Sequence, residues 1–334
     1  MKILIVAPNW IGDALLAQPL FARLRQKFPG STVDALAPVW TAPVLRRMPE
    51  IAEVIDAPFG HGELKLAERW NLARSLRGRI YDQAIILPNT LKSALIPFFA
   101  GVPVRTGFTG ELRYGLLNRV HNLDAQALPL MAERYAQLAE PPGSPPARPL
   151  ADVKLRVDEE NLVQALGRLG LSRSKPMVAF CPGAEYGPAK RWPARYFAEL
   201  AVKLAAQGRA IWLFGSDKDR EIGEEIVRLS AGGAINLCGR TDLASAIDLL
   251  SLAEVVVSND SGLMHVAAAV GRPVVALYGS SSPEHTPPLS RTHRIVRTGI
   301  DCSPCYAREC PLGHFKCMNE LTPARVLQEI RPVT

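Results

Sequence analysis

The first residue whose type and position suggest chemistry is Asp13, a carboxylate that ends the loop Pro8-Asn9-Trp10-Ile11-Gly12. Gly12 allows a tight turn, and Asp13 follows where a helix is expected to begin. Two roles fit this position: a helix N-cap that accepts backbone N–H hydrogen bonds, or a general base exposed at a ligand site. The loop lacks the G-x-G-x-x-G pattern, which disfavours a nicotinamide or flavin dehydrogenase.

A second loop, residues 181–193, combines glycine with positive charge. Its two glycines leave backbone N–H groups able to approach an anion, and Lys190 and Arg191 add two cations. An anion-binding loop and a solvated basic loop both fit this composition. A third loop carries Asp219, whose carboxylate fits either a contact to ribose hydroxyls or a cap on the next helix.

The fourth loop leads into a helix of small residues. Asp260, Ser261 and Gly262 stand at the helix start, where backbone N–H groups and the helix dipole favour a bound pyrophosphate. His265 follows Ser261 by four residues, so both lie on one face of the helix within reach of a ligand. A buried histidine bonded to the backbone is the alternative.

The elements that must position these loops alternate between short apolar runs and helical periodicity. Residues 1–7 are typical of a buried parallel strand, and apolar residues at four-residue spacing predict one helix from Asp13 to Phe28. The pattern restarts after the proline-rich stretch 141–146, which reads as a surface connection. Further strands are predicted at 33–37, 54–56, 84–87 and 104–107, then at 177–181, 210–214, 255–258 and 274–278.

This alternation predicts an α/β protein made of two doubly wound domains, residues 1–150 and 151–334. Ligands of such sheets bind beyond the carboxyl ends of the strands, which is where the four loops lie. A length of 334 residues also favours two domains, and 48% hydrophobic with 21% charged residues is globular composition.

The formal net charge of +7 favours anionic partners. Lys and Arg are scattered and no nucleic-acid-binding motif is present, so we predict no nucleic-acid partner. The apolar run from Ala94 to Val104 is too short to span a bilayer, and the N-terminus lacks the pattern of a signal peptide. We therefore predict a cytoplasmic protein.

Four of the six cysteines, Cys302, Cys305, Cys310 and Cys317, lie in one short segment that also holds His314. Reduced structural thiols, a structural metal site and a disulfide all fit this cluster.

Taken together, the loops resemble the ADP-heptose:lipopolysaccharide heptosyltransferases, glycosyltransferase family 9. Nearly the whole chain takes part, because the matching segments occur in order along it. They are Asn9-Trp10-Ile11-Gly12-Asp13, Pro182-Gly183-Ala184-Glu185-Tyr186-Gly187, Lys190-Arg191-Trp192-Pro193 and Asn259-Asp260-Ser261-Gly262-Leu263-Met264-His265.

The resemblance implies a GT-B fold, in which two Rossmann-like domains face each other across a cleft, the first binding acceptor and the second binding donor. It leaves open that the last helix packs back on the N-terminal domain. The implied reaction is inverting transfer of heptose from ADP-heptose to the inner core of lipopolysaccharide, with no cofactor and no catalytic metal. The implied acceptor is Kdo-lipid A with one heptose, reached by peripheral contact with the cytoplasmic face of the inner membrane.

The resemblance also assigns roles to individual residues. Asp13 matches the proposed general base and Lys190 the pyrophosphate contact. Asp219 matches the ribose-binding acidic position, where a relative carries Glu. The donor phosphates and sugar are assigned to Asp260, Ser261, Gly262 and His265.

Arg105 and Arg113 are candidates to hold the anionic acceptor, or are unpartnered surface arginines. Two other functions use the same scaffold: a different nucleotide-sugar enzyme, such as a 2-epimerase or a hexosyltransferase, and a non-catalytic sugar-nucleotide-binding protein.

Overall fold

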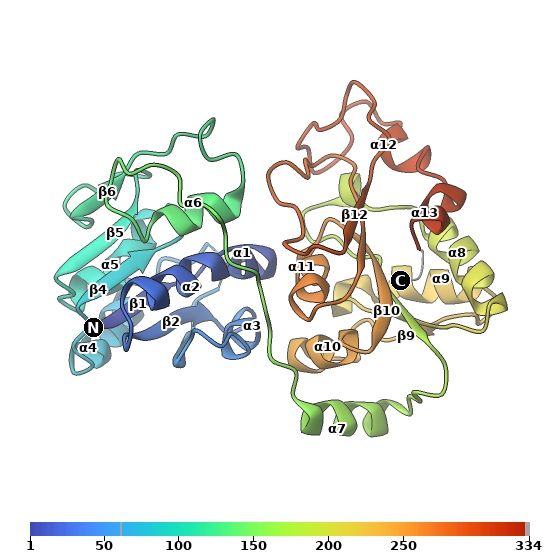
Figure 1. Ribbon diagram of the computed structural model, residues 1–334, viewed down its shortest axis with the longest axis horizontal. Helices are drawn as coiled ribbons and strands as arrows, with labels where there is room; N and C mark the ends of the chain where they lie inside the picture. The colour runs from blue at the N-terminus through green and yellow to red at the C-terminus, as the bar shows by residue number, and fades with distance from the viewer. Residues whose placement is uncertain (61, 331–334) are drawn as a thin grey trace. The chain divides into compact units, whose positions relative to one another are not determined.

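The computed structural model describes residues 1–60 and 62–330, and the chain divides into two compact units, Met1–Val153 and Lys154–Thr334 (Figure 1). Each unit is built on a six-stranded, wholly parallel sheet with its own buried core. The prediction of two doubly wound α/β domains is therefore confirmed.

The sheet of unit 1 has the strand order β3-β2-β1-β4-β5-β6. Its central strands read as near-continuous apolar runs, because both faces of a parallel sheet are covered by helices. The strands are β1 Lys2–Val6, β2 Thr32–Pro38, β3 Glu53–Ala57, β4 Gln83–Ile86, β5 Val104–Phe108 and β6 Arg119–His121.

The helices of unit 1 pack in pairs, α2 against α6 and α4 against α5. The single helix predicted from Asp13 to Phe28 is wrong in extent, because the chain forms two helices that meet at Ala17, with Pro19 in the first turn of the second. The helices are α1 Ile11–Leu16, α2 Gln18–Lys27, α3 Ala42–Arg46, α4 Leu66–Arg77, α5 Leu91–Phe99 and α6 Met131–Gln137.

Unit 2 repeats this topology, with the strand order β12-β11-β10-β7-β8-β9. Its strands are β7 Met177–Cys181, β8 Ala210–Leu213, β9 Ile235–Asn236, β10 Ala253–Asn259, β11 Val274–Leu277 and β12 His293–Val296. Its α-helices are α7 Glu159–Leu169, α8 Ala194–Ala206, α9 Arg220–Leu229, α10 Leu243–Leu250, α11 Gly262–Ala269, α12 Lys316–Asn319 and α13 Pro323–Glu329. Two 3₁₀ turns, η1 Pro188–Lys190 and η2 Asp217–Asp219, precede α8 and α9.

The last described helix, α13, which we expected to be able to pack on the first domain, lies against α8 of its own unit. Val326, and Ile330 just after the helix, belong to the core of unit 2. Glu329 Oε2 lies 3.3 Å from Arg294 Nη1 of β12.

In both units the strand order reverses beside the first strand, between β1 and β4 in unit 1 and between β7 and β10 in unit 2. At such a point the loops after the two central strands separate and leave room for a ligand. The functional loops should therefore be those that follow β1 and β4, and those that follow β7 and β10.

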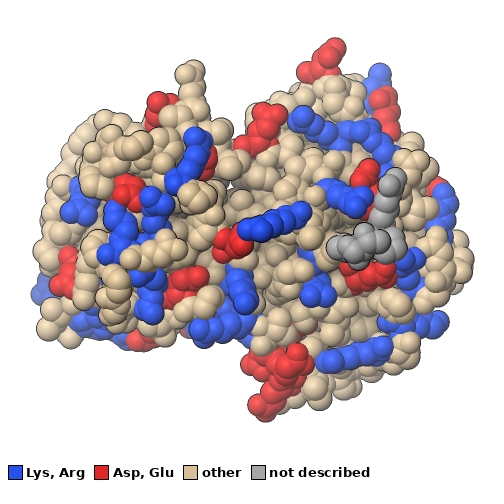
Figure 2. Space-filling view, viewed as in Figure 1, with Lys and Arg blue, Asp and Glu red and all other residues tan. Residues whose placement is uncertain are grey.

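Charge is dispersed over the surface: on the face that Figure 2 shows, Lys and Arg are spread over both units with Asp and Glu among them. None of the described helices is both long enough and apolar enough to cross a bilayer.

Candidate functional site

Unit 1 has a pocket of about 230 Å³ at its reversal point. Its walls come from the loop after β1, the loop after β4, the end of β5 and helix α6. Asp13 and Arg134 are the charged residues that line it, and the others are Pro8, Asn9, Trp10, Leu87, Pro88, Asn89, Phe108, Leu123, Met131 and Tyr135.

Asp13 reaches this pocket from the first turn of α1. The N-cap position belongs to Trp10, so the N-cap interpretation of Asp13 is wrong. A carboxylate in the first turn is still favoured by the helix dipole. Burial, and after it the charge of the nearby Asp13, raises the pKa of the Tyr135 hydroxyl well above its usual value. Asp13 is thus a carboxyl group on the pocket wall, near the Tyr135 hydroxyl.

Arg113 and Arg105 have hydrogen-bond partners, so the interpretation of them as unpartnered surface arginines is wrong. Arg113 is buried and donates to Pro88 O at 2.7 Å, to Asn89 Oδ1 at 3.1 Å and to Phe108 O at 2.5 Å. All three acceptors belong to residues that line the pocket. Arg105 donates to the carbonyl oxygens of Val102 and Leu116 at 2.7 and 2.6 Å. Arg113 therefore holds the loops after β4 and β5 together.

We expect Arg113→Ala to lower the free energy of unfolding by roughly 2–4 kcal/mol, because it removes a buried side chain and leaves the buried Phe108 O and the half-buried Pro88 O without a donor. Arg105→Ala is the matched control: it removes the same group from a half-buried position outside the pocket, and its cost should be smaller. Denaturant titration followed by circular dichroism measures both. Equal losses for the two variants would contradict this account of Arg113.

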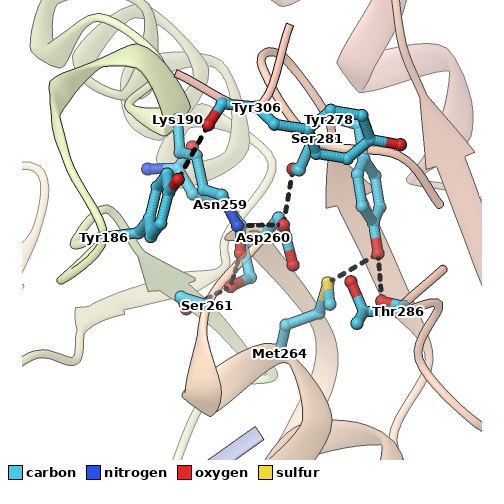
Figure 3. Close-up of polar contacts among 11 residues, drawn as sticks. Tyr186, Lys190, Asn259, Asp260, Ser261, Met264, Tyr278, Ser281, Thr286 and Tyr306 are labelled. Carbon is cyan, nitrogen blue, oxygen red and sulfur yellow. Dashed lines mark hydrogen bonds and ion pairs between the residues drawn. The ribbon is translucent and has the colours of Figure 1, made fainter. Parts of the chain in front are cut away.

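In unit 2 the polar group at the reversal point centres on Asp260, as Figure 3 shows. Lys190 Nζ lies 2.5 Å from Asp260 Oδ2, and Ser281 Oγ donates to the same oxygen at 2.5 Å. Asp260 is buried and the Lys190 side chain is 17% exposed. The structure thus joins two predicted residues from loops 70 positions apart, and adds Ser281.

Asn259 explains why these loops meet. Its buried side chain donates to Pro182 O at 2.7 Å and accepts from Trp192 N at 3.1 Å, so it ties both ends of the lysine loop to β10. Neither Asn259 nor Ser281 was among the predicted site residues. Asn259 is the last residue of β10, and Ser281 lies in the loop after β11. These positions at the carboxyl ends of strands were a usable signal, because that is where parallel sheets place ligand contacts.

Helix α11 begins beside this group. Ser261 is its N-cap residue and forms no side-chain cap, and Gly262 is its first residue. Ser261 Oγ lies 3.4 Å from Ser258 Oγ. The backbone N–H groups of this first turn have no partner inside the helix, which suits an anion. Lys190 and the start of α11 therefore bring positive charge to one point.

His265, in the second turn of α11, is 5% exposed. Burial lowers the pKa of its imidazole to about 4, against the opposing effect of Asp260. The ring is thus neutral at pH 7 and cannot neutralise a phosphate by charge, although it keeps one N–H donor.

Asp219 lies apart from the Lys190 group, and within the described part of the chain no hydrogen bond or ion pair joins the two. Its Oδ2 accepts from Ser216 N at 2.9 Å and Ser216 Oγ at 2.8 Å, which stabilises the start of η2. A Cβ at Gly183 would lie 2.5 Å from its carboxylate carbon. Gly183 is thus needed for the close packing of Asp219 against the loop after β7.

All six cysteines are free thiols. The pKa of the Cys317 thiol is raised first by burial and then by the neighbouring Cys302, Cys305 and Cys310, so the four clustered cysteines lie near one another. Within residues 1–60 and 62–330, no three His, Cys, Asp or Glu side chains are arranged to hold a metal ion.

Comparisons with known proteins agree with this picture. The sequence model of glycosyltransferase family 9 (heptosyltransferase) matches residues 69–316. The chain is 46% identical to lipopolysaccharide heptosyltransferase 2 of Escherichia coli K12, over 99% of this chain and 97% of that one. It is 44% identical to lipooligosaccharide heptosyltransferase 2 of Haemophilus ducreyi, over 99% and 98% of the two chains.

Among solved structures, the chain superposes on the E. coli ADP-heptose lps heptosyltransferase II with a TM-score of 0.88, at 45% identity and over 99% of this chain and 97% of that one. The predicted GT-B class, with two Rossmann-like domains, is confirmed by this match together with the strand order of both sheets. The resemblance predicted from four loops extends over the whole length. The chain is a member of glycosyltransferase family 9, the heptosyltransferases.

Proposed function

We propose that this chain transfers heptose from ADP-heptose to the inner core of lipopolysaccharide, as the heptosyltransferase II relatives are named for doing. The observation that carries the proposal is the ion pair of Lys190 with Asp260 at the start of α11. It supports the proposal because it brings a cation and the backbone N–H groups of a helix start together, and such groups bind the phosphates of a nucleotide diphosphate.

In this proposal unit 2 binds the donor. Lys190 and the N–H groups of Ser261 and Gly262 hold the pyrophosphate, while the free oxygen of Asp260 and the N–H of His265 are available to sugar hydroxyls. Asp219 accepts from the ribose hydroxyls with the carboxylate oxygen that Ser216 leaves free. Cleavage leaves negative charge on ADP, and the donor groups around Lys190 stabilise that charge.

Unit 1 binds the acceptor in the Asp13 pocket. The acceptor hydroxyl attacks the anomeric carbon on the face opposite the leaving ADP, which inverts the configuration. As it attacks, Asp13 takes the proton of this hydroxyl. Arg134 is the basic residue on the pocket wall, so we assign contact with the anionic acceptor to Arg134 in place of Arg105 and Arg113. Its guanidinium suits a Kdo carboxylate or a phosphate of Kdo-lipid A that carries one heptose.

Such an acceptor is anchored in a membrane, so we propose a cytoplasmic enzyme that contacts the inner membrane peripherally. The dispersed basic residues of Figure 2 suit this weak electrostatic contact. The proposed reaction needs no cofactor.

The decisive experiment is a donor screen with the purified protein. ADP-heptose, UDP-sugars and GDP-sugars are each supplied with Kdo-lipid A carrying one heptose, and mass spectrometry detects the product. We expect extension by one heptose from ADP-heptose only. Conversion of the donor without acceptor would indicate an epimerase, extension from another donor a hexosyltransferase, and binding without any product a non-catalytic protein.

Removal of divalent metal should leave transfer largely intact, because Lys190 and the start of α11 already supply positive charge at the pyrophosphate. Initial rates with and without excess chelator test this. Loss of rate that magnesium or manganese restores would overturn the metal-free mechanism. Release of zinc together with unfolding would instead identify the cysteine cluster as a structural metal site.

A further inference from the structure

The cysteine-bearing segment, residues 299–315, holds three of the four clustered cysteines and is fixed to both loops of the proposed donor site. On one side Ser303 Oγ donates to Gly279 O and Tyr306 N donates to Ser280 O, both at 2.6 Å, in the loop after β11. On the other side Tyr186 Oη donates to Tyr306 O at 2.7 Å, as Figure 3 shows. The segment is therefore part of the wall of the donor site.

The backbone of this segment meets the backbone of the lysine loop at Arg308. Arg308 O accepts from Ala189 N at 3.0 Å, inside η1. A Cβ at position 187 would overlap this carbonyl group, so only glycine fits there. This hydrogen bond holds the backbone of Arg308 beside Ala189, the residue that precedes Lys190.

The side chain of Arg308 is exposed and lies over Tyr186, with its guanidinium carbon 5.2 Å from the ring centroid. Lys190 Nζ lies 5.0 Å from the same centroid. The two cations are therefore within about 10 Å of each other, which one pyrophosphate with its flanking groups can span. Among the described residues, the guanidinium of Arg308 has this ring contact but no hydrogen bond or ion pair.

Charge explains why a second cation is needed. Lys190 is paired with buried Asp260, so the two together carry no net charge. The pyrophosphate of a nucleotide sugar is a dianion, and cleavage of the sugar bond adds to the charge on the leaving group. A guanidinium binds phosphate oxygens in pairs and is always protonated, which suits this role.

We propose that Arg308 is a donor-binding residue: its guanidinium contacts the pyrophosphate, and Tyr186 holds it in place through the ring contact. This inference rests on the proposed function, because it takes a nucleotide diphosphate sugar as the donor. It also gives the cysteine-bearing segment a function, which is to carry this cation to the site.

The test is the affinity of the full-length protein for ADP, measured by calorimetry on four proteins: the wild type, Arg308→Gln, Lys190→Met and Arg228→Gln. Arg228 is the matched control, because it is an exposed arginine in the last turn of α9. Helix α9 begins near the carboxyl end of β8, so its last turn lies away from the proposed donor site. We expect Arg308→Gln to weaken ADP binding about tenfold and Arg228→Gln to leave it unchanged.

Adenosine, as a competitor without phosphates, separates binding from structure. Its affinity should be the same for the wild type and Arg308→Gln if Arg308 contacts the pyrophosphate. An equal loss for ADP and adenosine would overturn the inference and make Arg308 a structural residue, as would unchanged ADP affinity in Arg308→Gln. If the wild type binds no ADP at all, the proposed function itself fails. Weaker ADP binding in Lys190→Met but not in Arg308→Gln refutes only the inference.

Discussion

Asp13→Asn should lower turnover by roughly 10²–10⁴, the usual contribution of a general base, while ADP binding stays as in the wild type. Asn has nearly the same shape as Asp but cannot accept the proton of the acceptor hydroxyl. The measurement is the initial rate at saturating donor and acceptor, together with calorimetry of ADP.

The position of Asp13 makes this substitution a clean test. Trp10 holds the N-cap position, and the substitution keeps the shape of the side chain while it removes a first-turn charge, which is worth about 0.3–1 kcal/mol at a helix start. Asp158→Asn is the matched control, since Asp158 caps α7 through Glu160 N and Asn161 N and should keep full activity. Near wild-type turnover of Asp13→Asn would remove Asp13 from the role of base.

The second large effect is expected for Lys190→Met, which should weaken ADP binding and slow transfer, since a charge-assisted contact to phosphate is worth about 1.5–3 kcal/mol. It should also destabilise the fold, because buried Asp260 loses its cation. Calorimetry of ADP and thermal unfolding measure the two effects separately.

A double variant distinguishes them. Asp260→Asn in the Lys190→Met background removes the unpaired buried charge and should recover much of the thermal stability. Donor affinity should stay low, because the cation is still missing. If ADP affinity returned together with stability, Lys190 would act by maintaining the fold and would not contact the donor.

The sequence predicted the central elements of the fold well and its edges poorly. Each of the nine predicted strands is present with its ends shifted by at most a few residues, because strands buried on both faces are apolar runs between turn residues. The strands β6, β9 and β12 were missed. They are short edge strands, and in β6 only His121 is buried, so little apolar pattern marks them.

The site was predictable where residues follow strands and unpredictable where packing decides. Lys190 and Asp260 were found from their loops, yet their ion pair depends on Asn259 bringing two distant loops together. Arg113 and Arg308 show the limit more clearly. In sequence both are ordinary arginines in loops, and only the fold buries the first behind a pocket and places the second over Tyr186.

The shared strand order of the two sheets bears on how specificity can change in this family. Each half of the chain presents its own ligand loops at the same topological point, and the contacts that fix those loops, such as Arg113 with Asn89 and Asn259 with Trp192, stay within one half. In our proposal the second half recognises the sugar nucleotide and the first half the lipid-linked glycan, so selection on the two specificities would act on separate stretches of the gene. Under that proposal, recombination near residue 153 would exchange one specificity and preserve the other.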